Sequence, residues 1–190
     1  MVTLKAAKSL KQKKCKECGN VYTPERSLQS VCTPGCAIAR ARKTREKQVK
    51  REIRDAKEKG KTRREWLKGA QTIFNTWVRE RDYGEPCISC GTRNNVQFAA
   101  GHYRTTKAAP ELRYEPLNVW KQCNNYCNKN LSGNLIEYRI NLIKKIGIES
   151  VEWLEGKHET KHYSIDELKE LIEEYKLKTK LLKKARDENS

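Results

Sequence analysis

Eight cysteines in four short-spaced pairs are the strongest constraint on how this chain can fold. In a secreted chain such pairs would suit four disulfides, whereas in a reducing compartment their spacing favours a bound metal. Four thiolates complete a tetrahedral zinc site and leave no open position for catalysis. The spacing therefore predicts two structural zinc sites. The first comprises Cys15, Cys18, Cys32 and Cys36, and the second comprises Cys87, Cys90, Cys123 and Cys127.

Composition argues against one large core. Of the 190 residues, 36% are hydrophobic and 34% are charged. This is less apolar material than a compact globular domain normally contains. We therefore expect modest cores held by metal and joined by solvated helices.

The charge of the chain is one-sided, with 41 Lys and Arg against 24 Asp and Glu, a net charge of +17. Such an excess favours a polyanionic partner, because each neutralised phosphate releases condensed counterions. Nucleic acid is the expected partner rather than anionic lipid. No apolar run approaches the roughly 18 residues of a spanning helix, and the basic N-terminus lacks the apolar core of a signal peptide. We therefore expect no membrane contact and a cytoplasmic location.

Changes in composition divide the chain into four segments. A basic arm and a cysteine knuckle are followed by a highly basic helical linker, a cysteine-containing domain and a C-terminal helical segment. The knuckle either caps the next helix or docks on DNA or protein. The linker, with a break at Gly60, is either a solvated helix or a strut along the DNA backbone. The segments are residues 1–36, 37–68, 69–150 and 151–190.

Periodicity predicts the elements around the second cysteine cluster. Apolar residues at helical spacing indicate an amphipathic helix over 62–83, with Arg81 on the same face. Residues 87–128 suggest two short strands and a loop, with a strand ending near His102 and a helix starting within 118–130. A further helix is expected over 131–147. Ser164 and Glu167 form a capping-box pattern that opens a long C-terminal helix. Its apolar stripe either packs back on the domain or forms a dimer interface.

His102, Asn118 and Asn128 lie between or beside the second set of cysteines. Hydrolysis of a phosphodiester at neutral pH requires a general base, a cation near the developing charge, and a group that holds the base. Histidine suits the first task. Mg²⁺ takes oxygen ligands and keeps several waters, so one or two side-chain oxygens suffice. The three residues therefore form a candidate catalytic site.

The order Cys-x2-Cys, His, Asn, Cys-x3-Cys-Asn resembles the HNH endonucleases, whose fold is the ββα-metal finger. More narrowly, residues 79–92, 99–114, 127–135 and 137–147 resemble the phage NinG, or Rap recombination endonuclease, family. The resemblance covers about residues 77–150 and extends more weakly to both ends. It implies an α+β fold with a zinc-held ββα-metal core. It also implies an endonuclease that cleaves branched DNA, such as Holliday junctions and D-loops, in the bacterial host of a phage or prophage.

Carried over by position, the resemblance implies that His102 is the general base, Asn118 orients it, and Asn128 contacts a catalytic Mg²⁺ or Mn²⁺. The sequence departs from the HNH pattern where Gly101 stands in place of a metal ligand. Either Glu111 or a backbone carbonyl then completes the metal site, or His102 itself binds the metal and another group is the base. The closing cysteine pair also has three intervening residues instead of two, which is expected to alter the start of the helix.

Four basic residues near this site are candidates for phosphate contacts: Arg104, Arg113, Lys121 and Lys129. Because a junction presents two related strands, a homodimer is the expected assembly. The alternative interpretation is a non-catalytic, zinc-containing DNA-binding accessory protein of recombination. A zinc-containing protein adaptor is a third class, but it leaves the charge of +17 unexplained.

Overall fold

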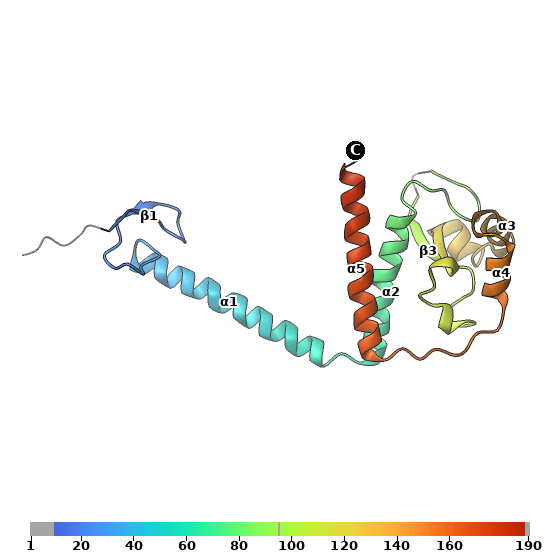
Figure 1. Ribbon diagram of the computed structural model, residues 1–190, viewed down its shortest axis with the longest axis horizontal. Helices are drawn as coiled ribbons and strands as arrows, with labels where there is room; N and C mark the ends of the chain where they lie inside the picture. Colours follow the sequence, from blue (N-terminus) through green and yellow to red (C-terminus); the bar gives the residue numbers. More distant parts are fainter. Residues whose placement is uncertain (1–9, 95, 189–190) are drawn as a thin grey trace, which may run out of the picture. The chain divides into compact units, whose positions relative to one another are not determined.

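The computed structural model describes residues 10–94 and 96–188 (Figure 1). It has a mixed α and β composition, mostly helical with two small sheets. The chain divides into two compact units, Met1–Lys61 and Thr62–Ser190. Residues 1–9, most of the predicted basic arm, lie outside the described residues. Within the part that is described, no helix is both long and apolar enough to cross a membrane.

The first unit consists of a cysteine knuckle and one long helix. Strands β1 (Lys13–Lys14) and β2 (Val21–Tyr22) pair antiparallel beside the cysteines. Helix α1 (Pro34–Lys59) begins where the Thr33 side chain caps the first turn, and it ends at Gly60, the predicted break. None of its 26 residues is buried. Propensity, capping and ion pairs on its surface must therefore stabilise it, because packing does not.

The second unit starts earlier than the predicted domain boundary at residue 69. A capping box between Thr62 and Glu65 opens helix α2 (Arg63–Arg81). The Thr62 backbone N–H donates to a Glu65 carboxylate oxygen at 2.7 Å, and the Glu65 N–H donates to the Thr62 hydroxyl at 3.3 Å. The amphipathic helix predicted over 62–83 is confirmed, and residues 63–68, which the division into segments placed in the linker, are its first turns.

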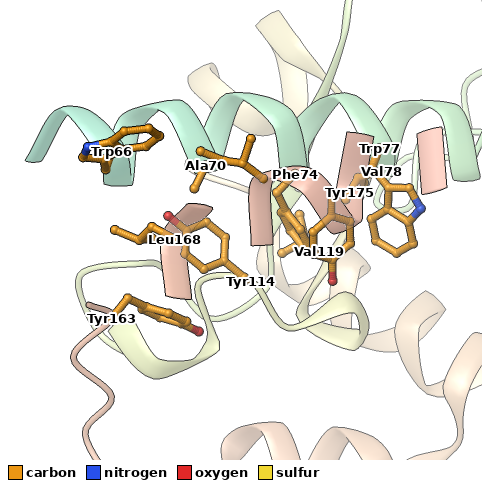
Figure 2. Packing of buried hydrophobic residues seen from close by; sticks show 11 residues of the cluster. Trp66, Ala70, Phe74, Trp77, Val78, Tyr114, Val119, Tyr163, Leu168 and Tyr175 are labelled. Atoms are coloured by element: carbon orange, nitrogen blue, oxygen red, sulfur yellow. The ribbon is translucent and has the colours of Figure 1, made fainter. Parts of the chain in front are cut away.

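Helices α2 and α5 (Ile165–Glu188) lie side by side and enclose an aromatic core (Figures 1 and 2). The predicted capping box opens α5, since the Ser164 N–H donates to Glu167 at 2.7 Å. The apolar stripe of α5 packs back on the domain, one of the two expected arrangements. The buried residues of this core are Trp66, Ala70, Phe74, Trp77, Val78, Tyr114, Val119, Tyr163, Leu168, Ile172 and Tyr175.

A two-stranded antiparallel sheet lies next to α2. Strand β3 (Phe98–His102) pairs with β4 (Val119–Cys123), and His102 is opposite Val119. The prediction of a strand ending near His102 is confirmed. The helix expected to begin near Asn118 does not include residues 119–123. These residues form strand β4 instead, because they pair with β3 and Val119 packs in the aromatic core. Helical structure starts only at Asn124, in the π-helical segment η3 (Asn124–Asn130).

A second apolar cluster lies beneath the loop that joins the two strands. This loop contains the short 3-10 turns η1 (Pro110–Leu112) and η2 (Pro116–Asn118). Helices α3 (Leu135–Ile146) and α4 (Ile148–Glu155) supply half of its buried residues, and α3 confirms the helix expected over 131–147. The buried members are Ile88, Tyr103, Ala109, Leu112, Tyr138, Leu142, Val151 and Leu154.

Candidate functional site

Each of the two predicted sets of cysteines forms a cluster that could hold a metal ion. In each cluster the four sulfur atoms lie within 4.8 Å of one another. Zn–S bonds of about 2.3 Å in a tetrahedron place the sulfur atoms about 3.8 Å apart. Cys90 and Cys123 are 3.8 Å apart, and Cys32 is 3.6 Å from Cys36. Both clusters therefore fit a structural zinc ion.

The first cysteine pair of each cluster adopts the same knuckle. Cys15 N–H donates to the carbonyl five residues ahead at 2.8 Å, and Cys87 N–H does the same at 2.9 Å. The glycines that follow the pairs, Gly19 and Gly91, have φ values of +79° and +70°, which glycine adopts without strain. A hydrogen bond from the Cys18 backbone N–H helps to lower the pKa of the Cys15 thiol to about 6. The turn thus favours the thiolate, which is the form that binds zinc.

The second cluster joins three elements at the end of the β3–β4 sheet where Cys123 is opposite Phe98, whereas His102 is opposite Val119 at the other end. Cys87 follows α2, Cys123 ends β4, and Cys127 lies in η3. The Cys123 N–H donates to the Cys87 sulfur at 3.3 Å, and the Cys127 N–H donates to the Cys123 sulfur at 3.3 Å. Three residues separate Cys123 from Cys127, and this spacing was expected to alter the start of the helix. The segment that follows Cys123 is indeed a wide π-helical turn, η3. A zinc ion here would hold β4 and η3 in fixed positions beside β3.

His102 is the last residue of β3 and is partly buried. Its ring Nε2 lies 3.0 Å from the carbonyl oxygen of Arg113. A carbonyl can only accept a hydrogen bond, so Nε2 carries the proton and Nδ1 has the lone pair. Burial lowers the pKa of His102 below its ordinary value. The ring is therefore neutral at pH 7, and Nδ1 is able to accept a proton.

Asn118 is fully buried and positions the loop that holds His102. Its amide nitrogen donates to the carbonyl oxygens of Arg104 and Leu112, both at 3.0 Å. Its oxygen accepts the Arg104 N–H at 2.7 Å. Asn118 thus fixes the backbone at Arg104 and at Leu112, the residue immediately before Arg113. The contact to the His102 ring comes from that carbonyl and not from the Asn118 side chain.

The structure gives a steric reason for Gly101, the departure from the HNH pattern. A Cβ atom at this position would lie 2.3 Å from Oε1 of Gln122. Gln122 is buried and donates to Ser89 Oγ at 2.6 Å. The Gly101 carbonyl also accepts a hydrogen bond from the Tyr138 hydroxyl at 2.8 Å. A side chain at residue 101 would require the buried Gln122 to shift, which explains why no side-chain metal ligand comes from this position.

Asn128 and Glu111, the two side chains considered as ligands of a catalytic metal, lie on different elements. Asn128 is in η3, which contacts β3, and Glu111 is in η1. Neither side chain has a hydrogen bond or an ion pair to any described residue, and both are partly exposed. Among the described residues, only the two cysteine clusters group three or more cysteine, histidine or acidic ligands.

The four candidate phosphate-binding residues differ in the contacts that their side chains make within the protein. Arg104 donates to the Glu155 carbonyl at 3.3 Å, and Arg113 donates to Gln71 at 3.2 Å. Lys121 donates to the Asp82 carbonyl at 3.3 Å and lies over the Phe98 ring. Lys129 is exposed in η3 and makes no such contact with described residues. Three of the four thus contribute to the fold, whereas the Lys129 side chain is exposed to solvent.

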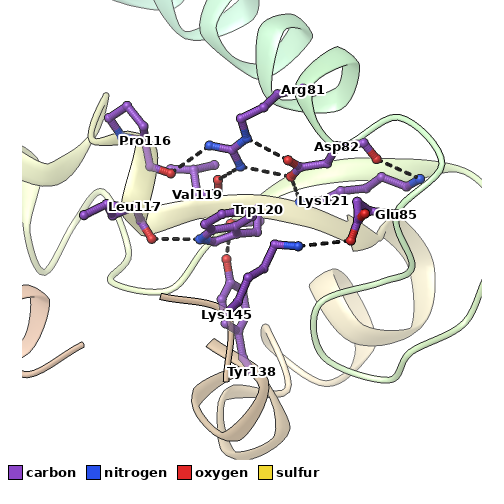
Figure 3. A network of polar contacts seen from close by, with 11 residues as sticks. Arg81, Asp82, Glu85, Pro116, Leu117, Val119, Trp120, Lys121, Tyr138 and Lys145 are labelled. Carbon is purple, nitrogen blue, oxygen red and sulfur yellow. Dashed lines mark hydrogen bonds and ion pairs between the residues drawn. The ribbon is translucent and has the colours of Figure 1, made fainter. Parts of the chain in front are cut away.

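Sequence reasoning missed a polar network behind β4 (Figure 3). Arg81 binds both carboxylate oxygens of Asp82, at 2.6 and 2.9 Å. It also donates to the carbonyl of Val119 at 2.7 Å and lies over the Trp120 ring, 4.1 Å from its centroid. Asp82 in turn accepts the Lys121 N–H at 2.9 Å. The signal in the sequence was Arg81 itself, a charged residue on the apolar face of α2.

Comparison with known proteins covers nearly the whole chain, across both structural units. Residues 7–187 match the family described as Bacteriophage Lambda NinG protein. The chain is 41% identical over 197 residues to protein ninG of Escherichia phage lambda, which covers 93% of this chain and 96% of that protein. Protein ninG of Salmonella phage P22 is also 41% identical, with coverages of 93% and 97%. No solved structure matches significantly. The chain therefore belongs to the NinG family.

Proposed function

We propose that this protein is a metal-dependent endonuclease that cleaves branched DNA, such as Holliday junctions and D-loops. The observation that carries the proposal is the state of His102. Its Nε2 is held by the Arg113 carbonyl, so the neutral Nδ1 can accept a proton at pH 7. The likeness of the cysteine, histidine and asparagine pattern to HNH nucleases supports the same chemistry.

In the proposed reaction, Nδ1 of His102 takes a proton from a water molecule as its oxygen attacks phosphorus. The bond from phosphorus to the leaving oxygen breaks, and that oxygen leaves with a proton from solvent. A Mg²⁺ or Mn²⁺ ion, when bound, supplies positive charge that stabilises the phosphate oxygens. Asn128 is the residue we assign to such an ion, with Glu111 as a second candidate. Zinc in the second cysteine cluster holds the frame.

Substrate form and assembly are part of the proposal. A four-way junction has two related strands to cut, so two copies of the chain related by a two-fold axis would match it. Because Leu168, Ile172 and Tyr175 of α5 are already buried against α2, they are not available as a dimer interface. Light scattering with and without junction DNA tests the dimer, and a monomer in both samples contradicts it.

The decisive experiment compares a labelled four-way junction with a linear duplex of the same sequence. Cleavage is measured with Mg²⁺, with Mn²⁺ and with no added divalent ion, for the wild type and for His102→Ala. His162→Ala is the matched control, because His162 is an exposed histidine in the segment before α5. Metal-dependent cutting of the junction should be lost only in His102→Ala, while binding of the junction and zinc content persist.

The alternative is a non-catalytic DNA-binding accessory protein of recombination. The exposed basic helix α1 and the two zinc-type clusters suit that class equally well. Junction binding by the wild type without cutting in either metal would reject the nuclease and favour this alternative. Equal cutting by the wild type and His102→Ala would instead reject the assigned base.

A further inference from the structure

Six basic residues of α1 form one continuous row along the helix, which we call the cationic row. Successive members are three or four residues apart, so they occupy neighbouring positions on one face. The row drifts by only about 20° every seven residues and stays on that face over its length. Of the four acidic residues of α1, Glu46 and Glu58 lie three or four positions from members of the row, and Glu52 and Asp55 do not. The members are Arg40, Lys43, Lys47, Lys50, Arg54 and Lys57.

All six members of the cationic row are exposed, as are nearly all residues of α1. Lys43 pairs with Glu17, and Arg54 lies 3.4 Å from Asp55. Lys47, Lys50 and Lys57 form no ion pair with any described residue. Like charges at neighbouring positions disfavour a helix. The row is thus a concentrated positive charge that the described residues only partly neutralise.

The knuckle anchors the end of α1 from which the row starts. Cys36, a member of the first cluster, lies in the first turn of α1, and its N–H donates to the Thr33 hydroxyl at 3.2 Å. Arg40 donates to the carbonyl of Lys16 at 3.2 Å. A zinc ion in this cluster would therefore fix the direction of the row relative to the knuckle.

We infer that the cationic row binds the phosphate backbone of double-stranded DNA. Seventeen residues separate its ends, which corresponds to a length of about 26 Å. B-DNA carries one negative charge for about every 1.7 Å of its axis when both strands are counted, so a row of this length lies against several phosphates. Side chains from neighbouring turns of α1 can each neutralise one phosphate. The row contains no pattern for base contacts, so the binding is independent of sequence.

The inference rests on the proposed function in one respect only: it assumes that the polyanionic partner is DNA. It requires no cleavage, and it holds for the nuclease and for the accessory protein alike. It assigns the knuckle and α1 to substrate binding, whereas the second unit carries His102. The face of α1 opposite the row also carries basic residues, which provide a matched control.

The experiment measures binding of a labelled 30-base-pair duplex by fluorescence anisotropy at a series of salt concentrations. All variants carry His102→Ala, so that cleavage cannot change the probe. The row variant is Lys47→Gln, Lys50→Gln and Arg54→Gln. The control variant is Arg42→Gln, Arg45→Gln and Lys59→Gln, which removes the same charge from the opposite face of α1. Circular dichroism and zinc content verify that both variants keep the fold.

The row variant should reduce the slope of log affinity against log salt by about 2.7, or 0.9 for each lost phosphate contact. The control should change the slope by less than about a third of that amount. Equal losses in both variants would mean that net charge alone attracts DNA, and this would overturn the inference. Unchanged binding in both would also overturn it. The inference would also be overturned if the protein bound phosphatidylserine vesicles but did not bind the DNA duplex.

Discussion

Nε2 of His102 lies 3.0 Å from the backbone carbonyl oxygen of Arg113. This contact links the last residue of β3 to the loop that returns to β4. The carbonyl selects the tautomer with the proton on Nε2, and Asn118 fixes the loop that presents it. The orientation of the candidate base therefore depends on a backbone atom that substitution of Arg113 does not remove.

The pH dependence of stability follows from the lowered pKa of His102. The unfolded chain binds this proton with a pKa of about 6.5, and the folded chain binds it more weakly. Below about pH 6.5 the unfolded state therefore holds more protons, so the free energy of unfolding falls as the pH drops. In urea titrations between pH 8 and 5, His102→Gln should lose less stability than the wild type. Parallel pH profiles for the two proteins would contradict the assigned burial effect.

Two glycines of the second unit should respond in opposite ways to alanine. Gly101→Ala should lower the free energy of unfolding by about 1–3 kcal/mol, because the added Cβ overlaps the buried Gln122 side chain. At Gly69, inside α2, the nearest atom would be 3.8 Å away. Gly69→Ala should therefore raise stability by about 0.4–1 kcal/mol. Chemical denaturation measures both, and a neutral Gly101→Ala would show that Gln122 can move aside.

The Arg81–Asp82 pair should be important to the stability of the second unit. Asp82 is 3% exposed, and its removal leaves the Arg81 charge without its partner behind β4. Asp82→Asn should lower the free energy of unfolding by about 3–5 kcal/mol. Glu173→Gln, which breaks an exposed ion pair with Lys176 on α5, should cost less than about 1 kcal/mol. Similar losses in both variants would argue against a special role for the buried pair.

Loss of one zinc ion should affect only the structural unit that contains its cysteine cluster. Cys18→Ser and Cys90→Ser each change the exposed second cysteine of a knuckle. Each variant should contain one zinc per chain where the wild type contains two, as measured by plasma emission spectroscopy. All four tryptophans lie in the second unit, so their fluorescence reports its unfolding alone. Only Cys90→Ser should lower that transition temperature, and a similar decrease in Cys18→Ser would show that the units depend on each other.

Local patterns in the sequence anticipated much of the architecture. The cysteine spacings predicted both clusters, because a knuckle is formed within six residues. Gly60 and the Ser164–Glu167 pattern predicted helix ends correctly, since capping depends on groups within one turn. The C-terminal stripe predicted a packed helix but could not select between packing on α2 and packing on a second copy. That choice depends on contacts between residues about 100 positions apart.

Other features depended on contacts that no local pattern contains. Residues 119–123 were expected to belong to a helix, but pairing with β3 and burial of Val119 make them a strand. Gly101 looked like a missing metal ligand, and only the position of Gln122 shows why a side chain is excluded there.

By itself the sequence determined the two cysteine clusters, the helical segments, the basic character and the identity of the candidate base. These properties are set by residue type and by spacing within a few turns of chain. Only the tertiary structure decided which ring nitrogen of His102 has the lone pair, why residue 101 is glycine, and how Arg81 is neutralised. Each of these depends on atoms that meet through folding, because burial and hydrogen-bond partners are properties of the packed chain.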